Sequence, residues 1–200
     1  EIGATPIQIA SAYGALANDG VLMKPYLFRK EIDPSGQIVR EAKPQLIRRV
    51  VSSRTAGILT GLFEGVVERG TGKLAAIEGV RIAGKTGTSR KYVEGKYETG
   101  SYTASFVGFL PADDPRMVCL VMLDNPRGGN YTGGTTSAPV FRAIAEQALN
   151  ISELFAPEAV VVASGEAQHE EMVDPLPEAA MRSLAAAAGT VPNVKGCSVR

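Results

Sequence analysis

The residues best suited to chemistry form one short run, Ala83-Gly84-Lys85-Thr86-Gly87-Thr88-Ser89, at the end of a segment with strand character. On a strand Thr86 and Thr88 share one face, because side chains alternate, so two hydroxyls can bind one group. Lys85 supplies an ammonium, and Gly87 lets the backbone of a ligand approach the strand edge. The backbone N–H of Thr88 can point at a developing oxyanion. Together these groups suit a site that holds a peptide with a terminal carboxylate.

The same run also has a plain structural explanation. A given tripeptide such as Lys-Thr-Gly occurs by chance in a chain of this length with a probability of roughly a few per cent. A Lys on an edge strand is also a common guard against aggregation. The tripeptide alone therefore does not distinguish a functional site from a structural feature. The elements around it are needed for that distinction.

Three consecutive strands are expected to position this run. We predict them at 80–88, 103–110 and 117–124, with the turn 111–115 between the last two and a polar stretch, 90–101, between the first two. The run from Met117 to Leu123 is apolar on both alternations. It therefore predicts a central strand that is covered on both faces.

Three helices are expected around these strands. The first begins with Thr5 as N-cap and Pro6 at the first helical position, and it stops at Asn18-Asp19-Gly20. The second is capped by Ser52 or Ser53 and ends at Gly70. The third starts near Ser137. The expected apolar faces of the last two comprise Leu59, Leu62, Phe63 and Val66, and Val140, Phe141, Ile144, Ala145, Ala148 and Leu149.

The element order predicts an α/β fold of the α+β type, an antiparallel sheet flanked by helices. A further hairpin is expected between the helices, with strands 26–32 and 37–41 joined by the turn Asp33-Pro34-Ser35-Gly36. Beyond Asn150 the composition shifts to Ala, Glu and Pro. We therefore expect one domain over 1–150 and a linker over 151–190.

The bulk composition excludes several classes of function. The 200 residues hold 21 Lys or Arg and 21 Asp or Glu, so nothing in the charge favours a nucleic-acid partner. The longest apolar run is far shorter than the roughly 20 residues of a membrane-spanning helix. The single His169 and the cysteines Cys119 and Cys197 have no metal-ligand spacing, so no metal or other cofactor is expected.

Several segments around the Lys-Thr-Gly run resemble, in the right order, the C-terminal half of the class B penicillin-binding proteins, the peptidoglycan transpeptidases. The resemblance covers about 1–150 and is far more specific than the tripeptide. The matching segments are Thr5-Pro6-Ile7-Gln8 with 15–20, Gly65 to Gly72, Ser105 to Pro111, Tyr131-Thr132-Gly133-Gly134, and Ser137 to Phe141. The resemblance implies a β-lactamase/transpeptidase-like fold, present here in part.

The resemblance also implies roles for individual residues. Catalysis in this family is acyl transfer through a serine ester, with the motifs Ser-x-x-Lys, Ser-x-Asn and Lys-Thr-Gly. Lys85 would set the electrostatics of the site, and Thr86 and Thr88 would bind the carboxylate of a stem peptide or a β-lactam. Gly87 would let the ligand backbone approach, and the N–H of Thr88 would be one oxyanion donor. Tyr131 would lie at the rim of the substrate site.

The first two motifs of the family do not occur in these 200 residues. No serine is followed by Lys three residues later, and no Ser-x-Asn is present. We therefore expect a fragment that by itself neither cross-links peptidoglycan nor binds penicillin covalently. Without the other half of the domain, bared apolar surface should drive self-association.

The C-terminal residues carry a second resemblance. Residues 191–200, Val-Pro-Asn-Val-Lys-Gly-Cys-Ser-Val-Arg, look like the opening of a PASTA module, an incomplete one, although a Val/Pro-rich tail is the alternative. Such a module would favour a division-type transpeptidase, anchored in the cell membrane with its catalytic domain outside the cytoplasm, and working with other division or wall-synthesis proteins. The alternatives are a β-lactam-sensing receptor domain and a non-catalytic cell-wall scaffold.

Overall fold

The structure is a computed structural model that describes residues 3–151 and residue 155. Its elements follow in the order α1 (Pro6–Ala17), β1 (Val21–Met23), β2 (Lys30–Ile32), β3 (Ile38–Glu41), β4 (Leu46–Arg49), α2 (Ser53–Glu68), the 3-10 turn η1 (Lys73–Ala75), β5 (Ala83–Val93), β6 (Lys96–Leu110), β7 (Met117–Asp124) and α3 (Ser137–Leu149). The predicted linker and terminal module lie almost wholly outside the described residues. None of the helices in the described part is long and apolar enough to span a membrane.

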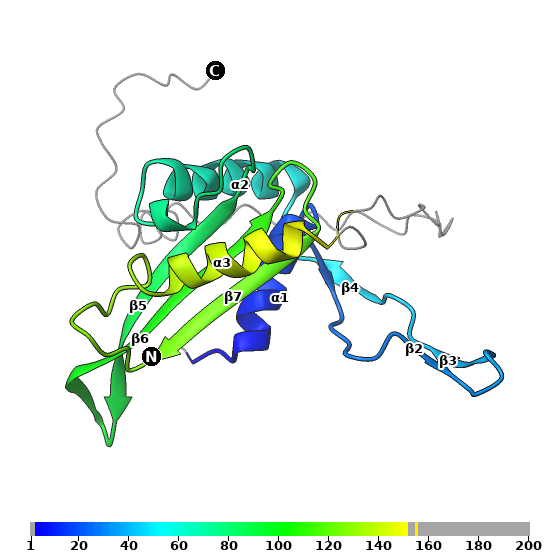
Figure 1. The fold of residues 1–200 in the computed structure, drawn as a ribbon, viewed down its shortest axis with the longest axis horizontal. Helices are drawn as coiled ribbons and strands as arrows, with labels where there is room; N and C mark the ends of the chain where they lie inside the picture. The colour runs from blue at the N-terminus through cyan, green and yellow to red at the C-terminus, as the bar shows by residue number, and fades with distance from the viewer. Residues whose placement is uncertain (1–2, 152–154, 156–200) are drawn as a thin grey trace. The chain divides into compact units, whose positions relative to one another are not determined.

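An antiparallel three-stranded sheet, ordered β5-β6-β7, forms the centre of the fold. Side chains on β6 alternate between its faces, with Phe106 and Leu110 in a cluster that includes Phe141 of α3, and Phe109 in a cluster that includes Tyr13 of α1. In Figure 1 α3 therefore lies in front of the sheet and α1 behind it. The predicted fold class, an antiparallel sheet flanked by helices, is confirmed.

Two predictions about the strands were wrong. The polar stretch 90–101 does not merely connect strands, because β5 runs on to Val93 and β6 starts at Lys96, with a two-residue turn at Glu94-Gly95. Both turn residues have positive φ, 49° and 84°, which suits a tight hairpin turn. The residues of this hairpin extension are mostly exposed, so they needed no apolar alternation.

The second wrong prediction placed 117–124 at the centre of the sheet. The predicted bounds of β7 are confirmed, but among the described residues it forms an edge strand, and only Val121 is buried. The central strand is β6, whose residues from Phe106 to Leu110 are all buried between the two helix layers. The apolar run therefore predicted an apolar strand at the right residues. Its place in the sheet is decided by the strands that pair with it, which the run does not specify.

The helix caps follow the sequence closely. Thr5 and Gln8 form a reciprocal capping box at the start of α1, and Pro6 opens the helix. Ser52 caps α2, its hydroxyl accepting a hydrogen bond from the N–H of Thr55 at 3.1 Å. These local pairings need only neighbouring residues, which is why sequence alone predicts them.

The apolar faces of α2 and α3 are narrower than predicted. Leu62 is 62% exposed, and Val140 and Ile144 are 40% and 43% exposed. On α3 the predicted Phe141, Ala145 and Ala148 are buried, together with Ala138, and on α2 the buried residues are Ala56 and Val67. Small residues let each helix approach the sheet closely, so the larger neighbours are left on the flanks.

Two small two-stranded sheets are formed by the residues between α1 and α2 in the sequence. The predicted hairpin over 26–41 is confirmed in shorter form as β2 and β3, and a pairing of β1 with β4 was not predicted. The turn is held by Asp33, whose Oδ1 accepts hydrogen bonds from the N–H groups of Ser35 (2.8 Å) and Gln37 (2.9 Å). The hydroxyl of Ser35 also bonds this oxygen, and these bonds lower the pKa of Asp33.

Candidate active site

The Lys-Thr-Gly run lies where the sequence predicts it, on the edge strand β5. Ala83 packs into the cluster on the α1 side of the sheet, so by alternation Lys85 and Gly87 face that side too. A side chain at Gly87 would meet the Oγ of Ser105 at 2.4 Å, which explains why the position needs glycine. Thr86 and Thr88 therefore share the opposite side of the strand, as predicted.

The ammonium of Lys85 has little that neutralises it. Its Nζ donates a hydrogen bond to the backbone O of Thr86 at 2.9 Å. The ion pairs among the described residues involve other cations, and none includes Lys85. Since an ammonium has three donors, Lys85 keeps donor capacity for a further group.

The hydroxyl of Thr86 is positioned by a residue that the sequence did not single out. Its Oγ1 lies 2.7 Å from the Oγ1 of Thr71, across 15 residues of chain. Thr71 follows α2, in a tight Gly70-Thr71-Gly72 bend where the N–H of Gly72 bonds the O of Val66 at 2.9 Å. The segment before the Lys-Thr-Gly strand therefore orients a hydroxyl of the candidate site.

The hydroxyl of Thr88 is positioned by the loop before α3. The N–H of Gly133 donates to the Oγ1 of Thr88 at 3.1 Å, across 45 residues. This loop lies directly against the sheet, because a Cβ at Gly133 would come within 2.0 Å of the Ser105 O and 2.5 Å of the Gly87 O. A Cβ at the adjacent Gly134 would likewise come within 2.3 Å of the O of Thr71. Both glycines are required by this approach.

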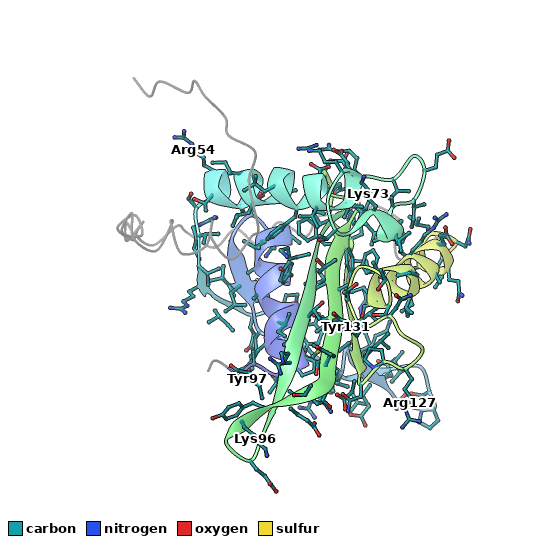
Figure 2. All side chains as sticks on the ribbon, turned by 90° about the vertical axis from the view of Figure 1, so that its left-hand side faces the viewer. Arg54, Lys73, Lys96, Tyr97, Arg127 and Tyr131 are labelled. Carbon is teal, nitrogen blue, oxygen red and sulfur yellow. The ribbon has the colours of Figure 1, made fainter. Side chains whose placement is uncertain are left out.

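Tyr131 begins the same loop. Its ring stacks on that of Tyr102 of β6, with centroids 4.2 Å apart and the planes inclined by 19°. Figure 2 shows Tyr131 beside the sheet, with Lys96 and Tyr97 further out at the tip of the β5–β6 hairpin. The stack links the loop to the outer part of the sheet, so Tyr131 lies close to the Lys-Thr-Gly strand without being part of it.

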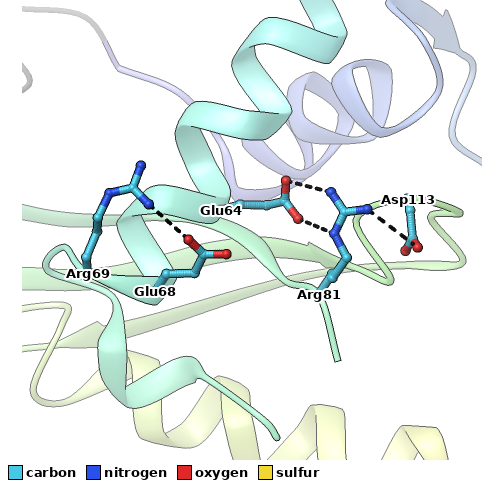
Figure 3. A network of polar contacts seen from close by, with 5 residues as sticks. All are labelled: Glu64, Glu68, Arg69, Arg81 and Asp113. Carbon is cyan, nitrogen blue, oxygen red and sulfur yellow. Dashed lines mark hydrogen bonds and ion pairs between the residues drawn. The ribbon is translucent and has the colours of Figure 1, made fainter. Parts of the chain in front are cut away.

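A polar network fixes the chain just before β5 (Figure 3). Arg81 makes two hydrogen bonds to the carboxylate of Glu64 on α2, at 2.8 and 3.0 Å, and lies 3.6 Å from Asp113 in the turn after β6. The hydrogen bonds and charge of Glu64 raise the pKa of Arg81. Because Arg81 lies two residues before Ala83, this network connects the start of the Lys-Thr-Gly strand to α2 and to the end of β6.

The arrangement combines an unneutralised cation, two positioned hydroxyls and a strand edge with no partner among the described strands. Such an edge can pair with the main chain of an extended peptide, while the cation on one face and the hydroxyls on the other are available to polar groups of that ligand. The site offers no serine activated by a Lys three residues later, since the chain contains none. The geometry therefore supports binding and polarisation of a substrate more directly than nucleophilic attack.

Comparison with known proteins identifies the class to which this fold and site belong. Residues 2–146 match the penicillin binding protein transpeptidase domain, and the chain belongs to this family. The expected resemblance to class B penicillin-binding proteins is thereby confirmed.

Individual relatives agree with the assignment. The chain is 40% identical over 149 residues to stage V sporulation protein D of Bacillus subtilis, covering 74% of this chain and 23% of that protein. It is 37% identical over 147 residues to the probable peptidoglycan D,D-transpeptidase PenA of Neisseria gonorrhoeae, covering 72% of this chain and 23% of that protein. The chain therefore spans about a quarter of the length of the curated relatives it matches.

Solved structures show the same fold. Penicillin-binding protein 3 of Mycobacterium tuberculosis, in its apo form, matches with a TM-score of 0.66 and 36% identity, covering 75% of this chain and 36% of that one. Penicillin-binding protein A of the same organism, solved as a ceftriaxone acyl-enzyme, matches with a TM-score of 0.66 and 33% identity. The match covers 72% of this chain and 32% of that one. The fold is that of the penicillin-binding and β-lactamase proteins.

Proposed function

We propose that these residues form the Lys-Thr-Gly side of a peptidoglycan D,D-transpeptidase, which cross-links cell-wall stem peptides by serine acyl transfer and is acylated by β-lactams. The observation that carries the proposal is the edge of β5, which no described strand covers, with Lys85, which no described carboxylate pairs, and the positioned hydroxyls of Thr86 and Thr88. The name of the Neisseria relative and the acyl-enzyme structure of the Mycobacterium neighbour support it.

In the proposed acyl transfer each of these residues has its own role. A serine oxygen, supplied outside these residues, attacks the carbonyl carbon of the donor stem peptide, and the leaving amine takes a proton. The amine of an acceptor stem then attacks the resulting ester and releases the serine. In the proposal the N–H of Thr88 stabilises the oxyanion, Thr86 and Thr88 bind the terminal carboxylate, and Lys85 sets the local charge. Gly87 admits the donor backbone, and Tyr131 borders the site.

Because these 200 residues contain no Ser-x-x-Lys, we expect them alone to be inactive. Incubation with fluorescent penicillin should leave the chain unlabelled after denaturing electrophoresis. A longer polypeptide, carrying the same residues and a Ser-x-x-Lys motif, should be labelled stoichiometrically. Labelling of the 200-residue chain would contradict the expected inactivity, and a folded longer chain that stays unlabelled would favour a scaffold. Labelling without transpeptidation of peptidoglycan stems would favour the receptor alternative.

The setting of the reaction is part of the same proposal. We place the transpeptidase in the cell membrane with this domain outside the cytoplasm, in a division role alongside other wall-synthesis proteins. The support is the likeness of residues 191–200 to the opening of a PASTA module, and the name of the Neisseria relative, a probable peptidoglycan D,D-transpeptidase. The domain boundaries near residues 150 and 190 belong to the proposal as well.

Self-association of the 200-residue chain is a further part of the proposal. The outer edge of β7 has no strand partner among the described residues. A pocket of about 530 Å³ beneath α1 is lined mainly by apolar side chains, among them Ile7, Leu16 and Ile47. Apolar surface of this kind drives association in water. Light scattering should give a mass of at least twice the 21.0 kDa of one chain. A monomer at high concentration would refute it.

A further inference from the structure

The positive charge of the domain is concentrated in one segment, residues 24–54, away from the Lys-Thr-Gly strand. This segment contains eight Lys or Arg against three Asp or Glu, whereas the rest of residues 1–150 contains ten against eleven. The segment includes β2, β3 and β4, and in Figure 1 β2 and β3 project from the three-stranded sheet. The excess charge therefore belongs to a surface that the proposed acyl transfer does not use.

The cations of this segment also differ from the others in their partners. Elsewhere in the described part of the chain, five of them form ion pairs: Arg69, Arg81, Lys91, Arg116 and Arg142. None of the eight in 24–54 forms one with any described carboxylate. Arg49 is used internally, since its guanidinium donates to the backbone O of Asp19 and the Oγ of Ser53. The remaining seven have no ion-pair partner in the described part of the chain, so their charge is available to a ligand.

Three of these cations line one pocket of about 430 Å³. Its walls are Lys24, Arg40 and Lys43, with Tyr26, Phe28 and Glu41. The strands around it are held together by backbone hydrogen bonds, from the N–H of Lys24 to the O of Gln45 and from the N–H of Ala42 to the O of Arg29, both 2.8 Å. The pocket is therefore bounded by segments whose main chains are hydrogen-bonded to each other.

The guanidinium of Arg40 is oriented before any ligand arrives. Its Cζ lies 4.9 Å from the ring centroid of Phe28, a cation–π arrangement that restricts the side chain. A guanidinium held by its face keeps its edge available for two parallel hydrogen bonds to a carboxylate. Arg40 is thus suited to a planar oxyanion, with Lys24 and Lys43 adding charge.

The surroundings of the pocket favour a peptide over other anionic partners. Leu27 is fully exposed, and Tyr26, Ile38 and Val39 of the same segment are exposed too, so the segment is apolar as well as basic. A polyphosphate has no apolar groups that could pack on these side chains. An anionic membrane would be repelled by Glu41 and cannot follow the concave shape of the pocket. The two strands β2 and β3 pair only with each other among the described strands, which leaves edges for a third.

We propose that the pocket formed by Lys24, Arg40 and Lys43 is a docking site for an acidic peptide segment of another protein, one that also carries an apolar side chain. Carboxylates of the peptide pair with the three cations, its apolar side chain packs on Tyr26 and Leu27, and its main chain extends the β2–β3 sheet. This site is independent of the acyl-transfer chemistry.

The test selects ligands from a random library of peptides of roughly twelve residues, displayed on phage, using the 200-residue chain as bait. Selected peptides are then synthesised with a fluorophore, and their affinity is measured by fluorescence anisotropy. The site variant is K24E/R40E/K43E. The control variant, K73E/K96E/R127E, makes the same charge change at exposed cations elsewhere, which Figure 2 labels. Far-ultraviolet circular dichroism checks that both variants retain the fold.

We expect peptides enriched in Asp and Glu, with affinity that falls at least about tenfold in the site variant and less than about threefold in the control. Raising the salt from about 0.05 to about 0.5 M should weaken binding, because the cations are exposed. Selected peptides without acidic enrichment, or equal loss in both variants, would overturn the proposal. It would also be overturned if soluble polyphosphate or anionic phospholipid vesicles bound the pocket more tightly than every selected peptide.

Discussion

Replacing Lys85 by alanine is expected to slow acylation by fluorescent penicillin by roughly 10²–10⁴-fold, in a polypeptide that joins these residues to a Ser-x-x-Lys motif. In the structure no described carboxylate neutralises this ammonium, so its charge acts on whatever occupies the strand edge. Loss of a preorganised cation or donor beside a developing charge typically has an effect of this size. The measurement is the second-order rate constant for labelling.

Two matched variants show whether the effect is specific to Lys85. Lys91→Ala removes a lysine from the same strand, but one whose Nζ is paired with Asp124 at 2.6 Å, and it should change the rate constant less than about threefold. Lys85→Arg keeps the charge in a different shape and should fall between the two. Equal rate constants for the parent chain and Lys85→Ala would refute the assigned role of Lys85.

Replacing Gly133 by alanine is expected to destabilise the 200-residue chain by about 1–3 kcal/mol, the usual range for overpacking. The new methyl group would lie 2.0 Å from the O of Ser105 and 2.5 Å from the O of Gly87. Both atoms are backbone in paired strands, so the loop must move instead, and its hydrogen bond to Thr88 is lost. Urea denaturation followed by circular dichroism should show the lower midpoint.

The control for this substitution is Gly61→Ala in α2. Apart from its chain neighbours and the backbone of its own helix, no atom lies within 4 Å of the position of its added methyl group, and the residue is exposed in a helix interior. Alanine is the better helix former, so this variant should be stabilised by about 0.5–1 kcal/mol. A Gly133→Ala variant as stable as Gly61→Ala would mean that the loop does not pack against β5 as the structure describes.

Local signals made much of the fold predictable. The N-caps at Thr5 and Ser52, the turn at Asp33 and the bounds of β7 all depend on residues within a few positions of each other. The Lys-Thr-Gly strand was predictable for the same reason, because alternation within one strand places the hydroxyls of Thr86 and Thr88 on a single face. The sequence by itself thus determined the three helices, the core of the three-stranded sheet, the family resemblance and the principal candidate residues, but not the pair β1–β4 or the hairpin extension of β5 and β6.

Only the tertiary structure decided which segments meet. The partners of Thr86 and Thr88 lie 15 and 45 residues away, and no periodicity in the sequence connects Thr71 or Gly133 to them. The central position of β6, the exposure of Leu62 and the basic pocket around Arg40 likewise depend on how elements pair and pack. Local propensity acts over a few residues, whereas strand order and side-chain contacts are decided by the packing of the whole domain.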